Sequence, residues 1–451
     1  MKNNFASLRI AVIGTGYVGL VSGACFAALG HDVTCVDTDT TKIDSLKRGE
    51  IPIYEPGLDA LVAKACTEGR LSFTNDIAKT SPWPSLVFLA VGTPSNPENG
   101  SADLSALFSA LNSVVTHSDD GTIIVTKSTV PIGTGAKLDA YVKEHFPGRV
   151  IYLASNPEFL REGSAVDDFM QPDRIVIGSN AAAAEDVLRA LYQPLTERGV
   201  PLISTNLETA ECIKYAANSF LAVKLAYINE LADLCERTQA NVSVVAEAIG
   251  ADPRIGRSYL KVGPGYGGYC LPKDTLALAY TAQENDIKLQ IVEAAIAANK
   301  TRKEVMLKKI LSALEAPYAG KTVALLGLSF KAGTDDLREA ISLFLIPNLQ
   351  KHGVNLRLFD PIITEKMLAR ALPGNQLPVS DNVEKCLDGA DLGVILIEWP
   401  DFNSLPWERY KLQMNSANVL DLRNVVSAKM LREKGFLYEG IGGAEKGFYP
   451  Y

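Results

Sequence analysis

Short apolar runs alternate with segments of helical periodicity through the first half of the chain. Each run is rich in valine, isoleucine and leucine and lacks the polar alternation of a half-exposed strand, which indicates burial on both faces. Runs of this kind, separated by helices, are typical of a parallel sheet in an α/β domain. We therefore predict strands at residues 9–13, 33–37, 86–91, 122–125, 150–153, 174–178 and 201–203.

From about Asn206 the apolar runs stop and helical periodicity takes over. Residues 209–238 predict one long helix, because apolar side chains recur at helical spacing and no proline interrupts them. Further helices are predicted at 242–249, 274–284 and 289–315, with a glycine-rich loop at 263–268. We expect this strand-free stretch to be a connector or an interface.

The alternation of strands and helices restarts at Lys321. Predicted strands at 322–327, 355–360, 392–397 and 419–422 indicate a second, smaller sheet. The expected fold class is α/β, with an N-terminal Rossmann-type parallel-sheet domain, a central long-helix domain and a smaller C-terminal Rossmann-like domain. The expected boundaries are 1–205, 206–316 and 317–440, followed by a tail at 441–451.

The composition excludes several classes of protein. The chain has 451 residues, of which 47% are apolar and 21% are charged, as in ordinary globular proteins. Its net charge of −8 leaves no surplus of basic residues, so we expect no nucleic-acid partner. No apolar run is long enough to span a bilayer, and residues 1–8 lack the apolar segment of a signal peptide. We therefore expect no association with membranes.

Cysteine and histidine usage indicates a reducing compartment and no metal chemistry. The seven cysteines include no CxxC pair, which fits a cytoplasmic protein. The histidines at positions 31, 117, 145 and 352 show no spacing typical of metal ligands. We therefore expect acid–base chemistry to rest on other side chains.

A glycine-rich turn follows the first predicted strand and opens a helix. Gly14 would make the tight turn, Gly16 would let a pyrophosphate approach the backbone, and Gly19 would let helix and strand pack closely. Asp37 ends the second predicted strand, where a carboxylate binds ribose hydroxyls and repels a 2′-phosphate. The turn therefore predicts a dinucleotide site that prefers NAD to NADP, although the same glycines could serve only a tight turn. Lys42 is either a surface lysine or a contact to ribose or phosphate.

A second local feature is a cysteine between a glycine-rich turn and a predicted helix start. Cys270 follows two glycines that keep its approach open, and Lys273 lies shortly after it. A helix N-terminus and a nearby cation lower the pKa of a thiol and favour the nucleophilic thiolate. Asp274 could hold a water or a proton near this thiol, or be only a carboxylate in the first helical turn. We interpret the other six cysteines as structural.

A thiolate and a dinucleotide together indicate one class of reaction. Oxidation of an alcohol to an aldehyde needs one hydride transfer and a base. Oxidation of the aldehyde needs a tetrahedral carbon that carries a hydride, and a thiolate creates this carbon by adding to the carbonyl. Loss of the hydride gives a thioester, and water releases the acid. The two features therefore favour oxidation as far as a carboxylate.

Several motifs, in order along almost the whole chain, resemble the nucleotide-sugar 6-dehydrogenase family, which includes UDP-glucose and GDP-mannose dehydrogenases. They are GTGYVGL at 14–20, PIYEPGL at 52–58, VGTP at 91–94, KSTVP at 127–131, NPEFLREG at 156–163, KYAAN at 214–218, the Cys270 loop and Phe330–Lys331. The resemblance implies oxidation of a sugar C6 alcohol by two NAD, with UDP-glucose as substrate and UDP held by the C-terminal domain. GDP-mannose or a UDP-N-acetylhexosamine is the alternative substrate.

The resemblance also implies a role for single residues. The catalytic positions are Cys270 as nucleophile, Lys214 and Asn218 at the C6 oxygen, and Asp274, Thr129 and Glu158 in the handling of water and protons. The cofactor contacts include the glycine turn, Asp37 and Lys42 already described. The full set is Gly14, Gly16, Tyr17, Val18, Gly19, Asp37, Lys42, Gly92, Thr93, Thr129, Glu162, Lys273 and Arg338. The substrate contacts are Glu158, Phe159, Leu160, Arg161, Glu162, Lys214, Asn218, Arg254, Tyr259, Lys261, Gly265, Cys270, Phe330, Lys331 and Arg423.

Simpler interpretations remain open for several of these positions. Lys214 could be an exposed helix lysine, Thr129 a strand-end residue with a local hydrogen bond, and Glu158 part of a turn. Tyr269 and Leu271 stand where many relatives have serine and phenylalanine, which weakens any inference about the sugar from this loop.

The resemblance also bears on assembly and on rival functions. Arg254 matches an arginine that, in members of the family, reaches across from a neighbouring subunit. This match implies a homodimer or a higher homo-oligomer. A non-catalytic NAD sensor or scaffold would be expected to lack Cys270, Lys214 and Asn218. A two-electron 3-hydroxyacid dehydrogenase would have no need of Cys270.

Overall fold

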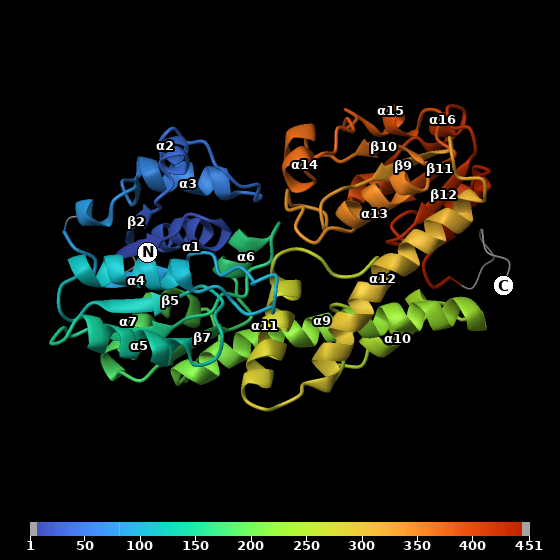
Figure 1. Ribbon diagram of the computed structural model, residues 1–451. Helices are drawn as coiled ribbons and strands as arrows, with labels where there is room; N and C mark the ends of the chain where they lie inside the picture. Colours follow the sequence, from blue (N-terminus) through green and yellow to red (C-terminus); the bar gives the residue numbers. More distant parts are fainter. Residues whose placement is uncertain (1–6, 81, 444–451) are drawn as a thin grey trace. The chain divides into compact units, whose positions relative to one another are not determined.

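The computed structural model describes residues 7–80 and 82–443, which divide into two compact units (Figure 1). The first unit comprises the described residues up to Ala217 together with Leu276–Ile287. The second comprises Asn218–Thr275 and the residues from Lys288 onward. Two helices, α9 (Leu207–Thr238) and α11 (Cys270–Glu284), contribute residues to both units.

The described part of the first unit contains an eight-stranded sheet in the order β3-β2-β1-β4-β5-β6-β7-β8. Its strands are β1 (Arg9–Ile13), β2 (Asp32–Val36), β3 (Leu71–Thr74), β4 (Leu86–Leu89), β5 (Ile123–Thr126), β6 (Tyr152–Ser155), β7 (Ile175–Ser179) and β8 (Leu202–Thr205). Its helices, besides the shared ones, are α1 (Tyr17–Ala28), α2 (Thr40–Lys47), α3 (Leu58–Thr67), the 3-10 turn η1 (Ile77–Lys79), α4 (Ser105–His117), α5 (Thr134–His145), α6 (Ala165–Met170), α7 (Ala182–Leu191) and α8 (Gln193–Thr196).

Helices cover both faces of this sheet, as the unbroken apolar runs predict. Helices α1, α3, α6 and α7 share one hydrophobic cluster with the sheet, and α4 and α5 share another. Along β1, Ile10 and Val12 belong to the first cluster and Ala11 to the second. Successive side chains of a strand point to opposite faces, so a strand buried on both sides needs apolar residues at every position.

One strand pair departs from the predicted parallel arrangement. Strand β7 runs antiparallel to β6, whereas β8 runs parallel to β7. The connection from β6 to β7 contains only the 6-residue helix α6. That helix is about 9 Å long and does not carry the chain back along the sheet. The chain therefore enters β7 near the carboxyl end of β6, and residues 156–164 stay at this end.

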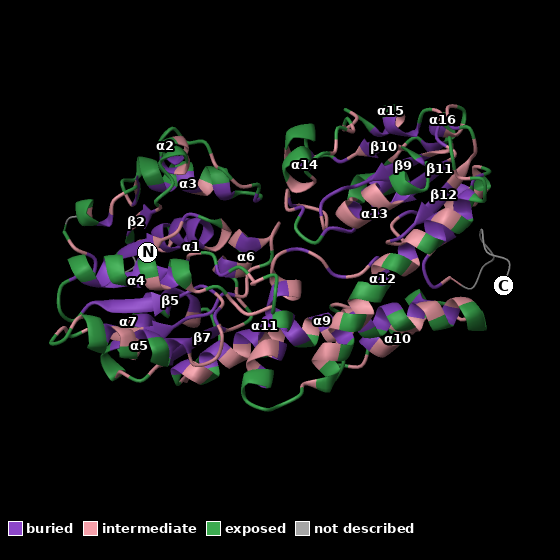
Figure 2. Ribbon diagram, in the orientation of Figure 1, coloured by how far each residue is buried: buried purple, intermediate pink, exposed green. Residues whose placement is uncertain are grey.

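The described part of the second unit contains a five-stranded parallel sheet in the order β10-β9-β11-β12-β13. Its strands are β9 (Thr322–Leu326), β10 (Asn355–Phe359), β11 (Leu392–Ile395), β12 (Asn418–Asp421) and β13 (Leu437–Gly440). Its helices, besides the shared ones, are α10 (Val242–Gly250), α12 (Gln290–Leu314), α13 (Ile341–Lys351), α14 (Glu365–Ala371), α15 (Val383–Leu387), the 3-10 turn η2 (Pro400–Ser404), α16 (Trp407–Lys411) and α17 (Ala428–Glu433). The strands of both sheets are largely buried, and the helices alternate buried and exposed faces (Figure 2).

The predicted α/β fold class is confirmed. The predicted strands are found, β1 with the predicted bounds and the others with shifted ends. Two strands were not predicted, the edge strands β3 and β13, which are each four residues long. At the predicted tail, Ile441 is buried and the Gly442 carbonyl accepts a hydrogen bond from the Val242 backbone at 2.9 Å. Residues 444–451 of that tail lie outside the described residues.

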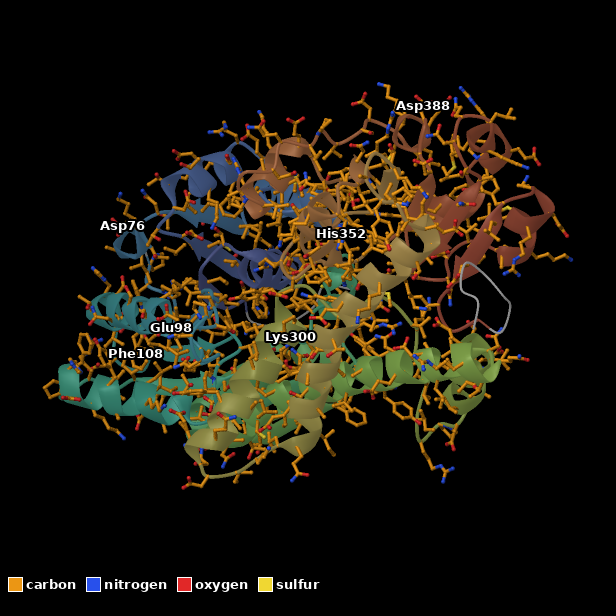
Figure 3. The ribbon with its side chains drawn as sticks, turned by 45° about the vertical axis from the view of Figure 1, so that its right-hand side comes forward. Asp76, Glu98, Phe108, Lys300, His352 and Asp388 are labelled. Atoms are coloured by element: carbon orange, nitrogen blue, oxygen red, sulfur yellow. The ribbon has the colours of Figure 1, made fainter. Side chains whose placement is uncertain are left out.

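The histidines contact protein groups and lie apart from one another. His352 is labelled in Figure 3. Its ring packs edge-on against Tyr318 at a centroid distance of 5.9 Å. His117 and His145 bond to backbone carbonyls on their own helices. Among the described residues, no three metal-ligating side chains gather, and no helix is long and apolar enough to cross a membrane.

Candidate active site

The glycine turn predicted to bind a dinucleotide connects β1 to α1. Gly14 has a φ of +99°, and a Cβ there would lie 2.6 Å from the carbonyl oxygen of Ala90, so only glycine fits. A Cβ on Gly16 would meet nothing within 4 Å. Gly16 also provides no side-chain cap for α1, so the first N–H groups of this helix keep their donor capacity. The turn therefore offers backbone donors and open space to phosphate oxygens.

The Asp37 carboxylate follows β2 and binds the glycine turn. Its Oδ2 accepts hydrogen bonds from the Thr15 backbone at 2.8 Å and the Thr15 hydroxyl at 2.7 Å, and its Oδ1 accepts from the Asp39 backbone at 3.0 Å. Partial burial alone raises the pKa of Asp37, but these hydrogen bonds and Lys42 outweigh it, so the pKa lies below its usual value. Lys42 Nζ lies 3.5 Å from Asp37 Oδ2. An ionised carboxylate at this position fits a free ribose and opposes a 2′-phosphate, so these residues fit NAD.

Three further predicted cofactor residues lie at the carboxyl ends of neighbouring strands. Gly92 and Thr93 follow β4, and Thr129 follows β5. The Thr93 hydroxyl donates to the Thr129 carbonyl at 2.7 Å, which joins the two loops. Strand β4 is next to β1, where the order of the sheet reverses. This switch point is where open α/β sheets bind dinucleotides.

Glu158 and Lys214 form a buried ion pair. Lys214 Nζ lies 3.0 Å from Glu158 Oε1, and each side chain is only 4% exposed. Glu158 Oε2 accepts a hydrogen bond from the Leu160 backbone at 2.6 Å. The structure therefore brings together two predicted catalytic residues, and Lys214 is not the exposed helix lysine of the simpler interpretation.

Phe159, a predicted substrate contact, lies between two cations. The Arg174 guanidinium is 3.7 Å from the centroid of its ring, and Lys214 Nζ is 5.4 Å from the same centroid. Contacts of this kind fix an aromatic ring and orient the cations beside it.

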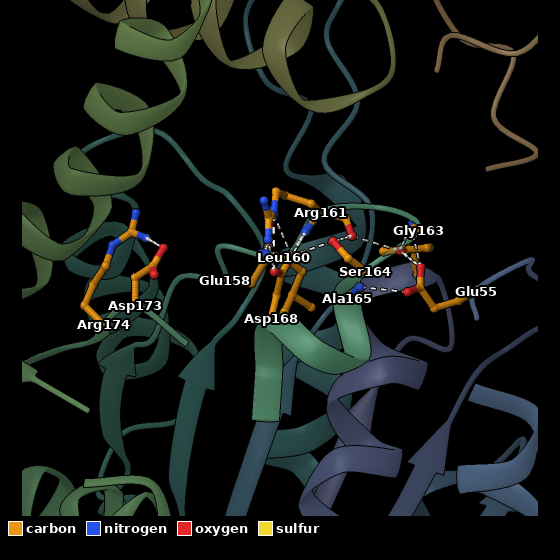
Figure 4. A network of polar contacts seen from close by, with 11 residues as sticks. Glu55, Glu158, Leu160, Arg161, Gly163, Ser164, Ala165, Asp168, Asp173 and Arg174 are labelled. Atoms are coloured by element: carbon orange, nitrogen blue, oxygen red, sulfur yellow. Dashed lines mark hydrogen bonds and ion pairs between the residues drawn. The ribbon is translucent and has the colours of Figure 1, made fainter. Parts of the chain in front are cut away.

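The carboxylates of Glu55 and Asp168 hold the loop at residues 158–165 in place (Figure 4). Glu55 accepts hydrogen bonds from the Gly163 backbone at 2.7 Å and from the Tyr17 hydroxyl. Asp168 accepts from the Arg161 backbone at 2.8 Å and from its guanidinium at 2.5 Å. The loop that carries the predicted substrate residues, Leu160 and Glu162 among them, is therefore tied both to the glycine turn and to α6.

Helix α11 begins at Cys270, earlier than the predicted start at 274. Pro272 belongs to the first turn, where a missing N–H costs nothing because that group has no partner in the helix. Cys270 is partly exposed. As the first residue of a 15-residue helix, it lies in the positive field of the helix N-terminus, which favours the thiolate.

The Asp274 carboxylate is fully buried one turn after the cysteine. Its Oδ1 lies 2.6 Å from Lys273 Nζ, and its Oδ2 accepts a hydrogen bond from the Asn218 amide at 2.6 Å. Asn218 is one helical turn after Lys214 on α9, so both side chains project from one side of that helix.

The glycine-rich turn before Cys270 packs closely against Phe330 and the backbone of Arg338. Gly268 has a φ of +77°, its backbone donates to the Arg338 carbonyl at 2.9 Å, and a Cβ there would lie 2.7 Å from the Phe330 ring. The Arg338 guanidinium lies 4.1 Å from the Tyr269 ring centroid. The sequence-based view that these glycines keep the approach open is therefore incomplete, because Phe330 covers one side of the turn.

Family models of the UDP-glucose/GDP-mannose dehydrogenases match three stretches of the chain. The NAD binding domain matches residues 8–196, the central domain 208–301 and the UDP binding domain 324–428. The chain belongs to the UDP-glucose/GDP-mannose dehydrogenase family. The resemblance drawn from the motifs is thereby confirmed.

Individual relatives match this family member over nearly its full length. A UDP-glucose 6-dehydrogenase of Rhizobium meliloti (strain 1021) is 45% identical over 437 residues, which cover 96% of this chain and 99% of the relative. The solved UDP-glucose dehydrogenase of Pyrobaculum islandicum has a TM-score of 0.89 at 35% identity, covering 98% of this chain and 99% of that chain. The solved UDP-D-ManNAc dehydrogenase of Pyrococcus horikoshii has a TM-score of 0.84 at 27% identity, covering 97% and 100%.

In the stretch that matches the family's UDP binding domain, Arg423 joins several loops. Its Nε lies 3.2 Å from the Leu396 carbonyl and 3.2 Å from Glu398 Oε2, and its Nη2 donates to the Phe330 carbonyl at 3.2 Å. A Cβ on Gly263 would lie 2.7 Å from Arg423 Nη1. The guanidinium is therefore held at a fixed place beside the glycine-rich loop.

The other predicted substrate residues of the second unit differ in backbone conformation and in their contacts. Tyr259 has a φ of +62°, and Gly265 has a φ of +109° with Asn299 Oδ1 2.6 Å from where a Cβ would lie. Lys261 lies between them in the same loop. The exposed Arg254 pairs with Asp252 at 2.5 Å, and Lys331 Nζ lies 5.5 Å from the Phe330 ring centroid.

Glu55, Lys127 and Glu211 are among the buried charged residues that sequence reasoning missed. Glu55 and Lys127 lie inside motifs that carried the resemblance, and Glu211 lies just before the KYAAN motif. The sequence signal that could have indicated their burial is a charged residue next to apolar residues. The partners lie far along the chain, so the pattern alone did not identify them.

Proposed function

We propose that the chain is an NAD-dependent UDP-glucose 6-dehydrogenase, which oxidises the C6 alcohol of UDP-glucose to the carboxylate of UDP-glucuronate and yields two NADH. The observation that carries this proposal is Cys270 at the start of α11, one turn from the buried Asp274 carboxylate. A two-electron alcohol dehydrogenase has no use for such a cysteine, whereas oxidation of an aldehyde needs a nucleophile. The named activity of the Rhizobium meliloti relative supports the choice of sugar.

Bound NAD supplies a nicotinamide that accepts a hydride. The chain's contribution in this proposal is to hold it, with the glycine turn at the pyrophosphate and Asp37 at the ribose. The other proposed contacts are Tyr17, Val18, Lys42, Gly92, Thr93, Thr129, Glu162, Lys273 and Arg338.

In the first oxidation, the C6 alcohol loses a proton and a hydride and becomes an aldehyde. Lys214 and Asn218 are proposed to bind the C6 oxygen, because a cation and an amide donor stabilise the negative charge that develops there. Glu158, which is paired with Lys214, and Thr129 are proposed to handle the proton.

In the second oxidation, the Cys270 thiolate adds to the aldehyde carbon, and the C6 oxygen takes up a proton to give a thiohemiacetal. Loss of the hydride and of that proton gives a thioester. Water then adds to the thioester carbon, the carbon–sulfur bond breaks, and the thiolate and the acid are released. Asp274 is proposed to hold the hydrolytic water, with Lys273 and Asn218 fixing its carboxylate.

The substrate contacts are proposed to come from two loops and the UDP binding domain. The loop from Phe159 to Glu162 would contact the sugar, and Tyr259, Lys261 and Gly265 would cover the diphosphate. Phe330, Lys331 and Arg423 would hold the nucleotide. Arginine and lysine suit a diphosphate because both donate charge-assisted hydrogen bonds.

The choice of sugar is tested by offering several nucleotide sugars. UDP-glucose, GDP-mannose and UDP-N-acetylhexosamines are each incubated with NAD, and NADH is counted for each sugar consumed. The proposal requires turnover of UDP-glucose, and its absence would overturn the assignment. Turnover of a UDP-N-acetylhexosamine alone would favour the activity named for the Pyrococcus horikoshii relative.

An apolar stripe on α9 supports a homodimer. Phe220, Tyr227 and Leu234 are 65%, 53% and 56% exposed. They recur every seventh residue, so they lie on one face of the helix. Phe220→Asp should shift the mass measured by light scattering towards the monomer. The matched control, Leu412→Asp, replaces an apolar residue that is 87% exposed away from the stripe and should leave the mass unchanged.

The compartment follows from the proposed nucleophile. Cys270 must remain reduced to act as a thiolate, and the cytoplasm keeps thiols reduced. We therefore place the enzyme in the cytoplasm.

A further inference from the structure

Lys127 is a buried cation that the proposed reaction does not yet use. It follows β5 and is 4% exposed. Its Nζ donates to the Asn156 side-chain oxygen at 2.8 Å and to the Tyr192 hydroxyl at 3.4 Å, and it lies 5.9 Å from the Phe169 ring centroid. Both hydrogen-bond partners are neutral groups. Burial of an ammonium among neutral groups is unfavourable, so packing alone does not explain a lysine here.

Asn156 connects Lys127 to the loop that carries Glu158. Its side-chain oxygen also accepts from the Tyr192 hydroxyl at 2.6 Å, and its side-chain nitrogen donates to the Val176 carbonyl at 2.8 Å. These bonds fix Asn156 between β5, β7 and the start of α8. Glu158 is two residues further along the chain, so the direction in which its carboxylate leaves β6 depends on this network.

Four titratable groups surround the Lys127 ammonium. They are Glu158 in the loop after β6, Lys214 on α9, the Cys25 thiol on α1 and the Tyr192 phenol. Burial raises the pKa of Cys25 to about 12 and also raises the pKa of Tyr192, so both are neutral near pH 7. Burial lowers the pKa of Lys127 to about 7, against the attraction of Glu158. The charge of Lys127 therefore changes near neutral pH.

We propose that Lys127 is a positioning residue, which holds Glu158 against Lys214 through Asn156. The inference rests on the proposed function, in which Glu158 and Lys214 act at the C6 oxygen and its proton. The charged Lys127 attracts the Glu158 carboxylate and repels the Lys214 ammonium, so the electrostatics of this pair change when Lys127 loses its proton. This coupling to the pair explains why the network includes a cation.

Three variants separate the charge of Lys127 from its hydrogen bonds. Lys127→Met removes the charge and the donor, Lys127→Gln removes the charge and keeps a donor, and Tyr192→Phe removes a neutral hydroxyl from the same network. Each purified full-length protein is assayed for kcat and KM with UDP-glucose and NAD across pH 6 to 10. Far-UV circular dichroism and the thermal midpoint establish that each variant is folded.

We expect Lys127→Met to lower kcat by about 10²-fold through misplacement of Glu158, with a smaller effect on the KM for NAD. The kcat of the unmodified enzyme should change near pH 7, where Lys127 loses its charge. Both lysine variants should lack this change, whereas Tyr192→Phe should lower the thermal midpoint and keep it. If Lys127→Met does not fold, the profile of Lys127→Gln decides the question. A folded lysine variant with the pH profile of the unmodified enzyme overturns the inference, as does loss of the change near pH 7 in Tyr192→Phe. Failure of the unmodified enzyme to turn over UDP-glucose would instead overturn the proposed function.

Discussion

The side-chain amide of Asn218 donates a 2.6 Å hydrogen bond to Oδ2 of Asp274, whose other oxygen is paired with Lys273. All three side chains are buried. A carboxylate with two fixed partners keeps one orientation, which is what the positioning of a hydrolytic water requires.

Asp274→Asn should therefore slow release of the acid more than formation of the thioester. The amide keeps the shape of the carboxylate but loses its negative charge, and we expect kcat to fall by about 10²- to 10⁴-fold. Intact-protein mass spectrometry after mixing with substrate and NAD should show a covalent adduct on Cys270. A fall in kcat without any adduct would contradict the role in hydrolysis.

Because Glu158 and Lys214 form a buried ion pair, we expect the effects of their substitutions on thermal stability to depend on each other. Lys214→Met leaves a buried carboxylate without its cation, and Glu158→Gln leaves a buried cation without its carboxylate, so each should lower the thermal midpoint. The double variant should lose less than the sum of the two single losses, because it strands no charge. Strict additivity in thermal unfolding would show that the ion pair contributes nothing to stability.

Asp37 should set the preference for NAD over NADP. Asp37→Ala removes the acceptor for the ribose hydroxyls and the repulsion of a 2′-phosphate, so the ratio of kcat/KM for NADP to that for NAD should rise by about 10-fold or more. Asp39→Ala is the matched control, because Asp39 caps α2 through the Lys42 backbone at 3.1 Å. An unchanged ratio in Asp37→Ala would count against the ribose role.

Glu211 makes part of the stability dependent on pH. Its carboxylate accepts hydrogen bonds from the Gly133 and Gly135 backbones at 2.6 and 2.7 Å, at the start of α5. Burial nevertheless raises its pKa from 4.5 to about 7. The stability that comes from this raised pKa is complete below pH 4.5 and is lost as the pH rises through 7.

The matching variant is Glu211→Gln, which does not titrate. The thermal midpoint of the unmodified protein should fall relative to that of the variant as the pH is raised from 4.5 to 8. A constant difference across this range would show that Glu211 does not titrate in the folded protein.

Local patterns in the sequence predict most of the fold. The strands of both sheets are apolar runs that a parallel sheet buries on both faces, and these predictions hold at β1, β4 and β11. The edge strand β3, with only Leu71 and Phe73 facing inward, gives a signal too short to recognise. Strand β7 was predicted, but its antiparallel direction was not, because strand direction depends on the connection before it.

The candidate site was predicted residue by residue, but its internal contacts were not. The glycine turn and the Cys270 loop are local motifs, and their conformations follow from neighbouring residues. The pairs Asn218–Asp274 and Lys127–Asn156 join residues from different elements, so they depend on tertiary packing. A buried lysine such as Lys127 is indistinguishable in the sequence from a lysine in solvent.

The most direct test of the central claim is the number of NADH formed for each UDP-glucose consumed, measured for the unmodified enzyme and for Cys270→Ala. The unmodified enzyme should yield two NADH and UDP-glucuronate. Cys270→Ala should release no uronate and lose activity by about 10⁴-fold or more, whereas Cys66→Ala, at an exposed cysteine, should behave like the unmodified enzyme. A single NADH from the unmodified enzyme, or two NADH and uronate from Cys270→Ala, would contradict the account.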